Sequence, residues 1–188
     1  MYKRQHHRYE TGLRYRDTLR EQGVYSPGSE YILMTLTDMA DPGLTVFPTH
    51  RLVRGLDHFQ QEDLLEACRE HFALLPQGSL RQSQETLESL YREGRHAFAL
   101  YAGGAYTVLA LRDPQVMADL LPDKSPAYRL LDVSVLHSLV LERHLHIDKE
   151  NMANQKNLTY TRSAEEAVAS VDQGESQCCF LLNPPRVE

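Results

Sequence analysis

Hydrophobic and polar positions follow a helical period in several segments of this 188-residue chain. Over residues 9–22, Tyr9, Leu13 and Leu19 fall roughly on one side of a helix, a pattern typical of an amphipathic helix. Gly23 follows directly and can end that helix. The same period predicts further helices over residues 61–71, 81–93, 114–121, 132–145 and 163–174.

Apolar runs bounded by turn residues predict strands elsewhere. The clearest hairpin is formed by residues 96–102 and 105–112, which are separated by a Gly-Gly pair. A second hairpin is predicted from residues 30–36 and 44–48, because Asp-Pro-Gly at 41–43 is a turn signal.

The last elements are predicted to be a strand at 158–162, a helix at 163–174 and a strand at 177–183. Ser163 and Glu166 have the spacing of a capping box at the start of that helix. Because this β-α-β unit adds parallel strands to the hairpins, we expect an α/β (α+β) fold. Its core would be a mixed sheet of about six strands with flanking helices.

Composition excludes several classes of protein. The net charge of −6 argues against a general nucleic-acid binder, which needs a basic face. The three cysteines do not form a disulfide framework, and adjacent Cys178 and Cys179 are expected to point to opposite faces of a buried strand. No apolar run approaches the ~20 residues that cross a bilayer, and the N-terminus lacks an apolar h-region, so we expect no signal peptide. We therefore expect a cytoplasmic protein that does not bind membranes.

The ends of the chain suggest how it is organised. Residues 1–5 show no period and run abruptly into the first helical pattern, so they are interpreted as a non-native leader. Residues 6–23 are then a helix from a truncated amino-terminal module, and residues 24–188 are the α/β domain. On this interpretation the amino-terminal part of the parent protein is missing.

The first candidate site is His6-His7-Arg8, just before the predicted helix at 9–22. A helix start offers free N–H groups and a partial positive charge, and arginine can bind two phosphate oxygens. This combination is typical of a phosphate-binding turn. The alternative is an ordinary basic turn on the surface.

The second candidate is Pro48-Thr49-His50-Arg51, after a predicted strand. His50 can act as a general acid or base near neutral pH, and Arg51 can hold an anion. The alternative is a turn with a hydrogen-bonded histidine.

Asp132 is expected to cap a helix, and His137 lies five residues away, which is not the spacing of a helical zinc pair. No metal site is predicted.

Four segments together resemble a known family. They are HHRYETGLRYRD, DMADPGLTVFPTHRLV, LLDVSVLHSLVLE and CCFLLNPPRVE. They resemble the family known only as domain of unknown function one thousand and fifteen. In that family Asp-Gly normally precedes the first segment, whereas here Arg4-Gln5 stands there. A glycine would let the backbone approach a phosphate closely, and Gln5 lacks that freedom.

The turn at His6-His7-Arg8 is also similar to the nucleotide-phosphate turn of the ParB and sulfiredoxin superfamily, which includes an archaeal kinase of free serine. That resemblance implies that His7 and Arg8 contact nucleotide phosphates and that Glu10 orients Arg8 or lies near a metal.

Together the resemblances imply a nucleotide-dependent phosphotransferase acting on a small hydroxylated metabolite, with ATP or ADP and Mg²⁺ as cofactors. Glu10 and His50 would be the catalytic residues, and His6, His7, Arg8 and Arg51 would bind the nucleotide or another phosphorylated molecule. The alternatives are a non-catalytic module that senses a nucleotide or metabolite, and an interaction domain without a ligand.

Overall fold

The computed structural model describes residues 3–35, 38, 41, 43 and 45–185, and the side chains of all of these except residues 3–7, 149 and 153. The chain divides into two compact units, residues 1–45 and residues 46–186. We call them the helical unit and the sheet unit.

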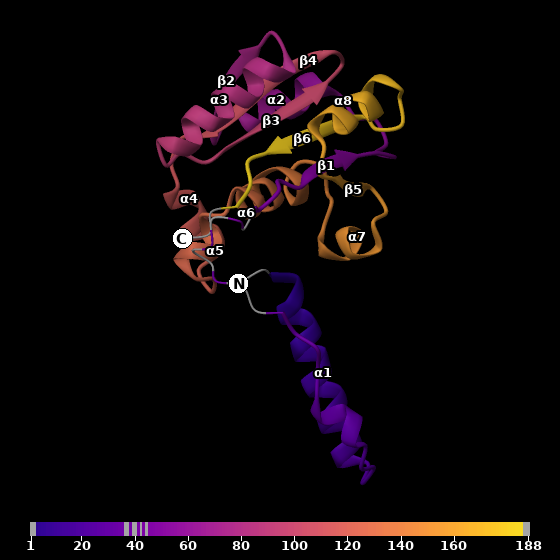
Figure 1. Cartoon of the computed structure of the whole chain (residues 1–188). Coiled ribbons are helices and arrows are strands. Elements are labelled where there is room, and N and C mark those ends of the chain that lie inside the picture. Colours follow the sequence, from indigo (N-terminus) through magenta and orange to yellow (C-terminus); the bar gives the residue numbers. More distant parts are fainter. Residues whose placement is uncertain (1–2, 36–37, 39–40, 42, 44, 186–188) are drawn as a thin grey trace. The chain divides into compact units, whose positions relative to one another are not determined.

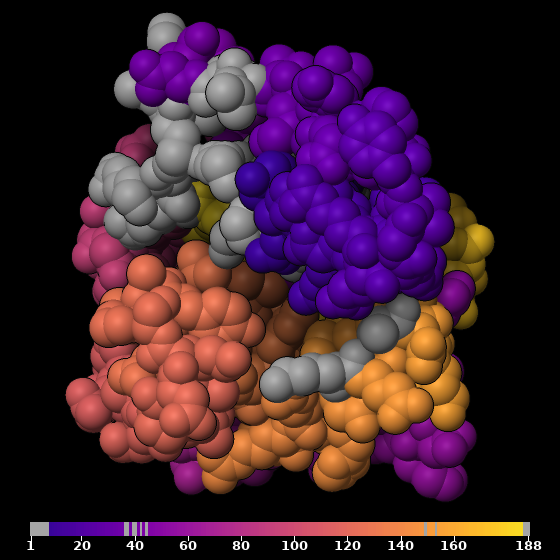
Figure 2. All heavy atoms as spheres, turned by 90° about the horizontal axis from the view of Figure 1, so that it is seen from below, coloured from indigo at the N-terminus to yellow at the C-terminus, as the bar shows by residue number. Residues whose placement is uncertain are grey.

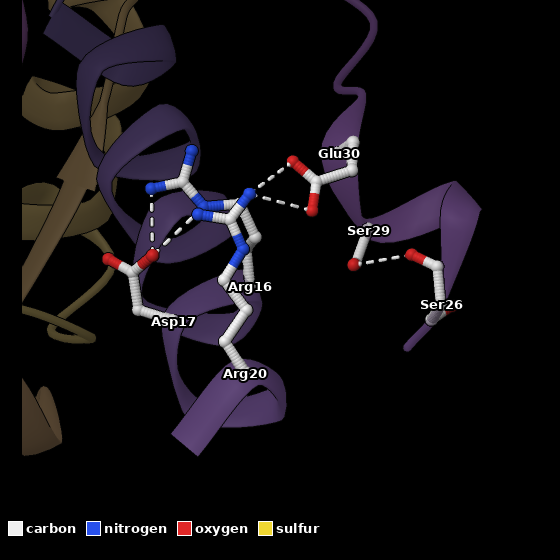
Figure 3. A network of polar contacts seen from close by, with 6 residues as sticks. All are labelled: Arg16, Asp17, Arg20, Ser26, Ser29 and Glu30. Atoms are coloured by element: carbon white, nitrogen blue, oxygen red, sulfur yellow. Dashed lines mark hydrogen bonds and ion pairs between the residues drawn. The ribbon is translucent and has the colours of Figure 1, made fainter. Parts of the chain in front are cut away.

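The helical unit consists of α1 (Lys3–Glu21) and the short 3₁₀ helix η1 (Pro27–Glu30). Gly23 follows α1 with a φ of 71°, the left-handed conformation that often ends helices. Arg20 Nη2 donates to both carboxylate oxygens of Glu30, at 2.9 and 2.8 Å, and so ties the two helices together (Figure 3). None of the described side chains of α1 is buried, so surface contacts rather than a core hold this unit.

Two predictions for the helical unit are wrong. The first helix begins at Lys3 and not near residue 9. A hairpin was expected from residues 30–36 and 44–48, of which residues 36 and 44 lie outside the described residues. Residue 30 lies in η1, and residues 31–35 and 45–48 have no regular secondary structure. Tyr31 and Leu33 are exposed, and a two-stranded hairpin without a further sheet to cover its apolar face is only marginally stable.

The sheet unit contains a six-stranded sheet in the order β2-β4-β3-β6-β1-β5 (Figure 1). Its strands are β1 (His50–Val53), β2 (Phe72–Gln77), β3 (Ala97–Ala102), β4 (Ala105–Leu111), β5 (Leu158–Thr161) and β6 (Cys178–Leu182). The number of strands and the α+β class are confirmed, and so is the hairpin of β3 and β4. The expectation of a mixed sheet is wrong, because every neighbouring pair is antiparallel. The reason is β1, which lies between β5 and β6 and keeps these two strands from pairing in parallel.

Helices cover both faces of the sheet. The α3 face carries α3 (Leu80–Arg92) and α8 (Ala164–Asp172). The α6 face carries α2 (Gln61–Cys68), α4 (Gln115–Leu120), α6 (Asp132–Leu136) and the π-helix η2 (His137–Glu142). As predicted, the side chains of adjacent cysteines in β6 point to opposite faces: Cys178 to the α6 face and Cys179 to the α3 face.

The core of the α6 face is built around Phe98, which is fully buried. Its ring meets those of Phe72 and Phe180 edge-on, with centroids 5.3 and 6.0 Å away. Two further helices are short, α5 (Pro126–Arg129) and α7 (Lys149–Asn154), and Met152 of α7 packs against this core. The segment of α4 and α5 forms a continuous part of the surface in Figure 2, in salmon, and exposes Leu120 and Leu130.

The ends of two predicted helices are confirmed or refined. Ser163 Oγ accepts a hydrogen bond from the backbone N–H of Glu166 at 3.1 Å, as the capping box predicts. The predicted helix at 132–145 is α6 followed without a break by η2. Within the described part of the chain, no helix combines the length and the apolar character that a bilayer span requires.

Candidate functional site

Strand β1 presents a polar side chain to each face of the sheet. Side chains alternate along a strand, so His50 lies on the α3 face with Leu52, and Arg51 lies on the α6 face with Val53. His50 and Arg51 were expected in a turn after a strand, but they lie within the strand itself. They therefore line two different cavities, which adjoin each other at Leu182, Asn183 and Pro184.

The cavity beside Arg51 lies where β1 begins, β6 ends and β3 begins. We call it the Arg51 cavity, and its volume is about 430 Å³. Apolar side chains form much of its wall: Leu130, Leu131, Val133, Leu182, Pro184 and Pro185. The charged or titratable residues among its lining are Arg51, Tyr91, His96 and Asp132. A cavity with an apolar wall and a few polar groups is typical of small-molecule sites.

Arg51 has few partners for a largely buried cation. Its Nη1 donates to the carbonyl oxygen of Thr49, and its guanidinium carbon lies 5.4 Å from the ring centre of Tyr160. Its Nε is buried and has no hydrogen-bond partner among the described residues. Burial lowers the pKa of Arg51 to about 10, because removal from water disfavours the charged form. Among the described residues, no carboxylate pairs with this guanidinium.

His137 lies close to the same charge. It begins the π-helix η2, and short π-helical segments are frequent at functional sites. Its Nε2 is buried without a partner in the described part of the chain. Burial and the positive charge of Arg51 lower the pKa of His137 to about 4. His137 is therefore neutral at pH 7 and leaves the charge of Arg51 without compensation.

His96 and Asp132 form a pair at the Arg51 cavity. His96 Nδ1 lies 2.9 Å from Asp132 Oδ1, and both side chains are largely buried. When Nδ1 donates to the carboxylate, Nε2 keeps its lone pair and can accept a proton or a hydrogen bond. Asp132 was expected to cap a helix, but Leu131 is the N-cap residue and Asp132 holds His96 instead.

His50 lines a different cavity, of about 540 Å³, between α3 and α8. The backbone N–H of Leu182 donates to its Nδ1 at 3.2 Å, so its Nε2 carries the proton. Burial, and then the charge of Arg51, lower the pKa of His50. His50 is thus a neutral histidine fixed by the backbone, and its predicted catalytic role stays a prediction.

The first predicted site lies on α1. Because α1 begins at Lys3, His7 and Arg8 lie inside the helix, beyond the first four residues whose N–H groups are free. The expected turn before the helix is therefore wrong. Arg8 is exposed and Glu10 is half-buried. The side chains of His6 and His7 lie outside the described residues, and the binding and catalytic roles of all four residues stay predictions.

Sequence reasoning missed His96, and it considered His137 only as a zinc partner of Asp132 and set that role aside. Neither has a local spacing signal, since His96 meets a partner 36 positions along the chain. Among the described residues, no group of three or more histidine, cysteine, aspartate or glutamate side chains is arranged to hold a metal ion.

Comparison with known proteins gives one match. A family model described as "Protein of unknown function (DUF1015)" matches residues 6–134. This segment includes β1 with Arg51, His96 before β3, and Asp132. No curated protein and no solved structure matches the chain.

Proposed function

The chain belongs to the DUF1015 family, whose description assigns no function, and we propose that its sheet unit binds a small anionic molecule in the Arg51 cavity. The observation that carries this proposal is the largely buried guanidinium of Arg51, which has no carboxylate partner among the described residues. A buried charge is costly unless it is paired. An anion in the cavity would supply the missing partner.

The chemistry of the cavity agrees with this role. A guanidinium can donate two parallel hydrogen bonds to a carboxylate or phosphate. The apolar wall lowers the local dielectric constant, which strengthens the attraction between the two charges. An arginine kept only for the fold would be expected to have its donors satisfied by the protein, whereas Arg51 Nε has no partner in the described part of the chain.

Calorimetry with a panel of small anions tests the proposal. The panel contains inorganic phosphate, sulfate, acetate and benzoate. Arg51→Gln should weaken binding about 10-fold or more, since a hydrogen bond to a charged group contributes roughly 1.5–3 kcal/mol. Arg81→Gln is the matched control, because Arg81 lies on the exposed surface of α3 and pairs with Glu85. Equal binding to the two variants, or no binding of any anion, contradicts the proposal.

A second candidate is a nucleotide-dependent phosphotransferase that acts on a small hydroxylated metabolite. The observation that favours it is the His96–Asp132 pair. An imidazole held by a carboxylate can take the proton from a hydroxyl group as that oxygen attacks a phosphoryl group. ATP or ADP would supply the phosphoryl group, and Mg²⁺ would neutralise its charge.

Turnover separates the two candidates. Protein, ATP or ADP, Mg²⁺ and a panel of hydroxylated metabolites would be assayed for a phosphorylated product. The second candidate requires product from the wild-type protein and none from His96→Gln, while anion binding to Arg51 is kept. Anion binding without product supports a sensing module and rules out the phosphotransferase.

A further inference from the structure

We infer that the Arg51 cavity accepts a monocarboxylic acid with an apolar body, and not a nucleotide or free phosphate. This inference rests on the proposed anion binding and names the class of anion. It follows from the number of charges on the cavity wall, from the character of that wall, and from the position of the His96–Asp132 pair.

The charge on the wall of the Arg51 cavity suits an anion with one negative charge. Among the described residues that line the cavity, Arg51 is the one permanent cation, and Asp132 is the carboxylate. Asp132 is already paired with His96 at 2.9 Å. One guanidinium matches one carboxylate in charge and in its two-point geometry. A nucleotide carries several negative charges, and sites that hold them use several cations or a series of backbone N–H groups.

The second step is the apolar wall. Leu130, Leu131, Val133 and Leu182 line the same cavity as Arg51, together with two prolines. Free phosphate has no apolar part to place against these side chains. A carboxylate with a hydrocarbon or aromatic body would bury apolar surface there, and that burial stabilises the complex. The volume of about 430 Å³ suits a small ligand of this kind.

The third step is the position of His96. In the sheet, β6 lies between β1 and β3, and the register places Arg51 level with Leu100, four residues along the chain from His96. The backbones of Arg51 and His96 are thus roughly 16 Å apart, and both side chains line the same cavity. A ligand held by Arg51 at its carboxylate would therefore extend toward His96. With Nδ1 engaged by Asp132, His96 Nε2 can accept a hydrogen bond from a hydroxyl at the far end of that ligand.

Calorimetry on the whole chain tests this assignment with defined probes. They are acetate, benzoate, 4-hydroxybenzoate, the neutral 4-hydroxybenzamide, inorganic phosphate, and ATP with Mg²⁺. We expect benzoate to bind at least 10-fold more tightly than acetate or phosphate. We expect 4-hydroxybenzoate to bind more tightly than benzoate, and the amide at least 10-fold more weakly than its acid. ATP should show no binding that Arg51→Gln removes.

Two variants keep the test independent of folding. Leu130→Asn changes a partly exposed residue of the wall, so it should weaken benzoate several-fold and leave acetate unchanged. Leu120→Asn is the matched control, since Leu120 is similarly exposed on α4 and does not line the cavity. It should leave both affinities unchanged, and an equal effect of the two variants on benzoate overturns the inference.

The outcomes also separate this inference from the proposed function. If phosphate or ATP binds in a way that Arg51→Gln removes, and the carboxylates do not, the assignment to carboxylic acids is wrong and the anion site stands. If no probe shows binding that depends on Arg51, both fail.

Discussion

Arg8 and Arg51 carry the same guanidinium group in opposite surroundings. Arg8 lies within the residue range of α1, and its side chain is exposed. Arg51 lies within the sheet, largely removed from water, and its pKa is lowered to about 10 by burial. At an exposed arginine, water and dissolved ions screen the charge, so an anion gains little free energy by binding there. At a buried, unpaired arginine the same anion relieves a cost that the fold already carries.

The two units that hold these arginines differ in the same way. The sheet unit has a core on each face of its sheet. Helix α1 has no buried side chain among those described. Keeping a charged side chain away from water costs free energy. Only the packing of a rigid core can offset that cost. We therefore place the candidate site in the sheet unit.

The largest expected effect concerns the core that supports Arg51. Phe98→Ala should lower the free energy of unfolding of the sheet unit by about 3–5 kcal/mol, the usual cost of removing a buried phenyl ring. Leu19→Ala in α1 should cost less than about 1 kcal/mol, because Leu19 is only half-buried. Urea unfolding measures both changes in the free energy of unfolding. Similar losses in the two variants would contradict the proposed difference between the units.

A pH effect sharpens the comparison at the site itself. The pKa of His137 is lowered from 6.5 to about 4 by burial and by the charge of Arg51. The unfolded chain therefore binds this proton at a higher pH than the folded chain does. The stability that His137 contributes is fully present above pH 6.5 and is lost as the pH falls from about 6.5 to about 4.

Urea unfolding at several pH values between 7 and 4 checks this dependence. His137→Gln should flatten the slope in that window. Arg51→Met should make the total loss of stability smaller, because removing the neighbouring charge raises the folded-state pKa of His137 toward 6.5 and so narrows the pH window. A slope that neither variant changes contradicts the assigned cause.

The smallest expected effect lies in the helical unit. Arg20→Ala removes the ion pair with Glu30, at 2.8 Å between partly exposed side chains. Exposed pairs contribute about 0–1 kcal/mol and are screened by salt. Thermal unfolding should therefore change little, and less still at high salt. A loss comparable to that of Phe98→Ala would show that this unit depends on more than surface contacts.

The fold was predictable where local pattern and long-range pairing agree. Strands β3 and β4 were predicted from two apolar runs and a Gly-Gly turn, and the hairpin is confirmed. Strand β2 was not predicted, because Pro76 interrupts its pattern. Proline removes a backbone donor and is tolerated at a sheet edge, and β2 is an edge strand. Strand β1 was not predicted either, since its pairing with β5 and β6 depends on partners more than 100 residues away.

The candidate site was predictable only in part. Arg51 was singled out as an anion ligand, although in a turn and together with His50. The alternation of a strand separates these two neighbours onto opposite faces. The His96–Asp132 pair was not predicted, because it forms where the start of β3 meets the start of α6. No spacing along the chain encodes such a meeting.

The most direct test of the central claim is the thermal stability of Arg51→Met with and without a small anion that the wild-type protein binds. If Arg51 is kept for binding, the variant without ligand should be as stable as the wild type or more stable, because a largely buried unpaired charge has been replaced by an apolar side chain. The anion should raise the Tm of the wild type only. A variant that melts several degrees lower, with an unchanged response to the anion, would make Arg51 a structural residue and contradict the account.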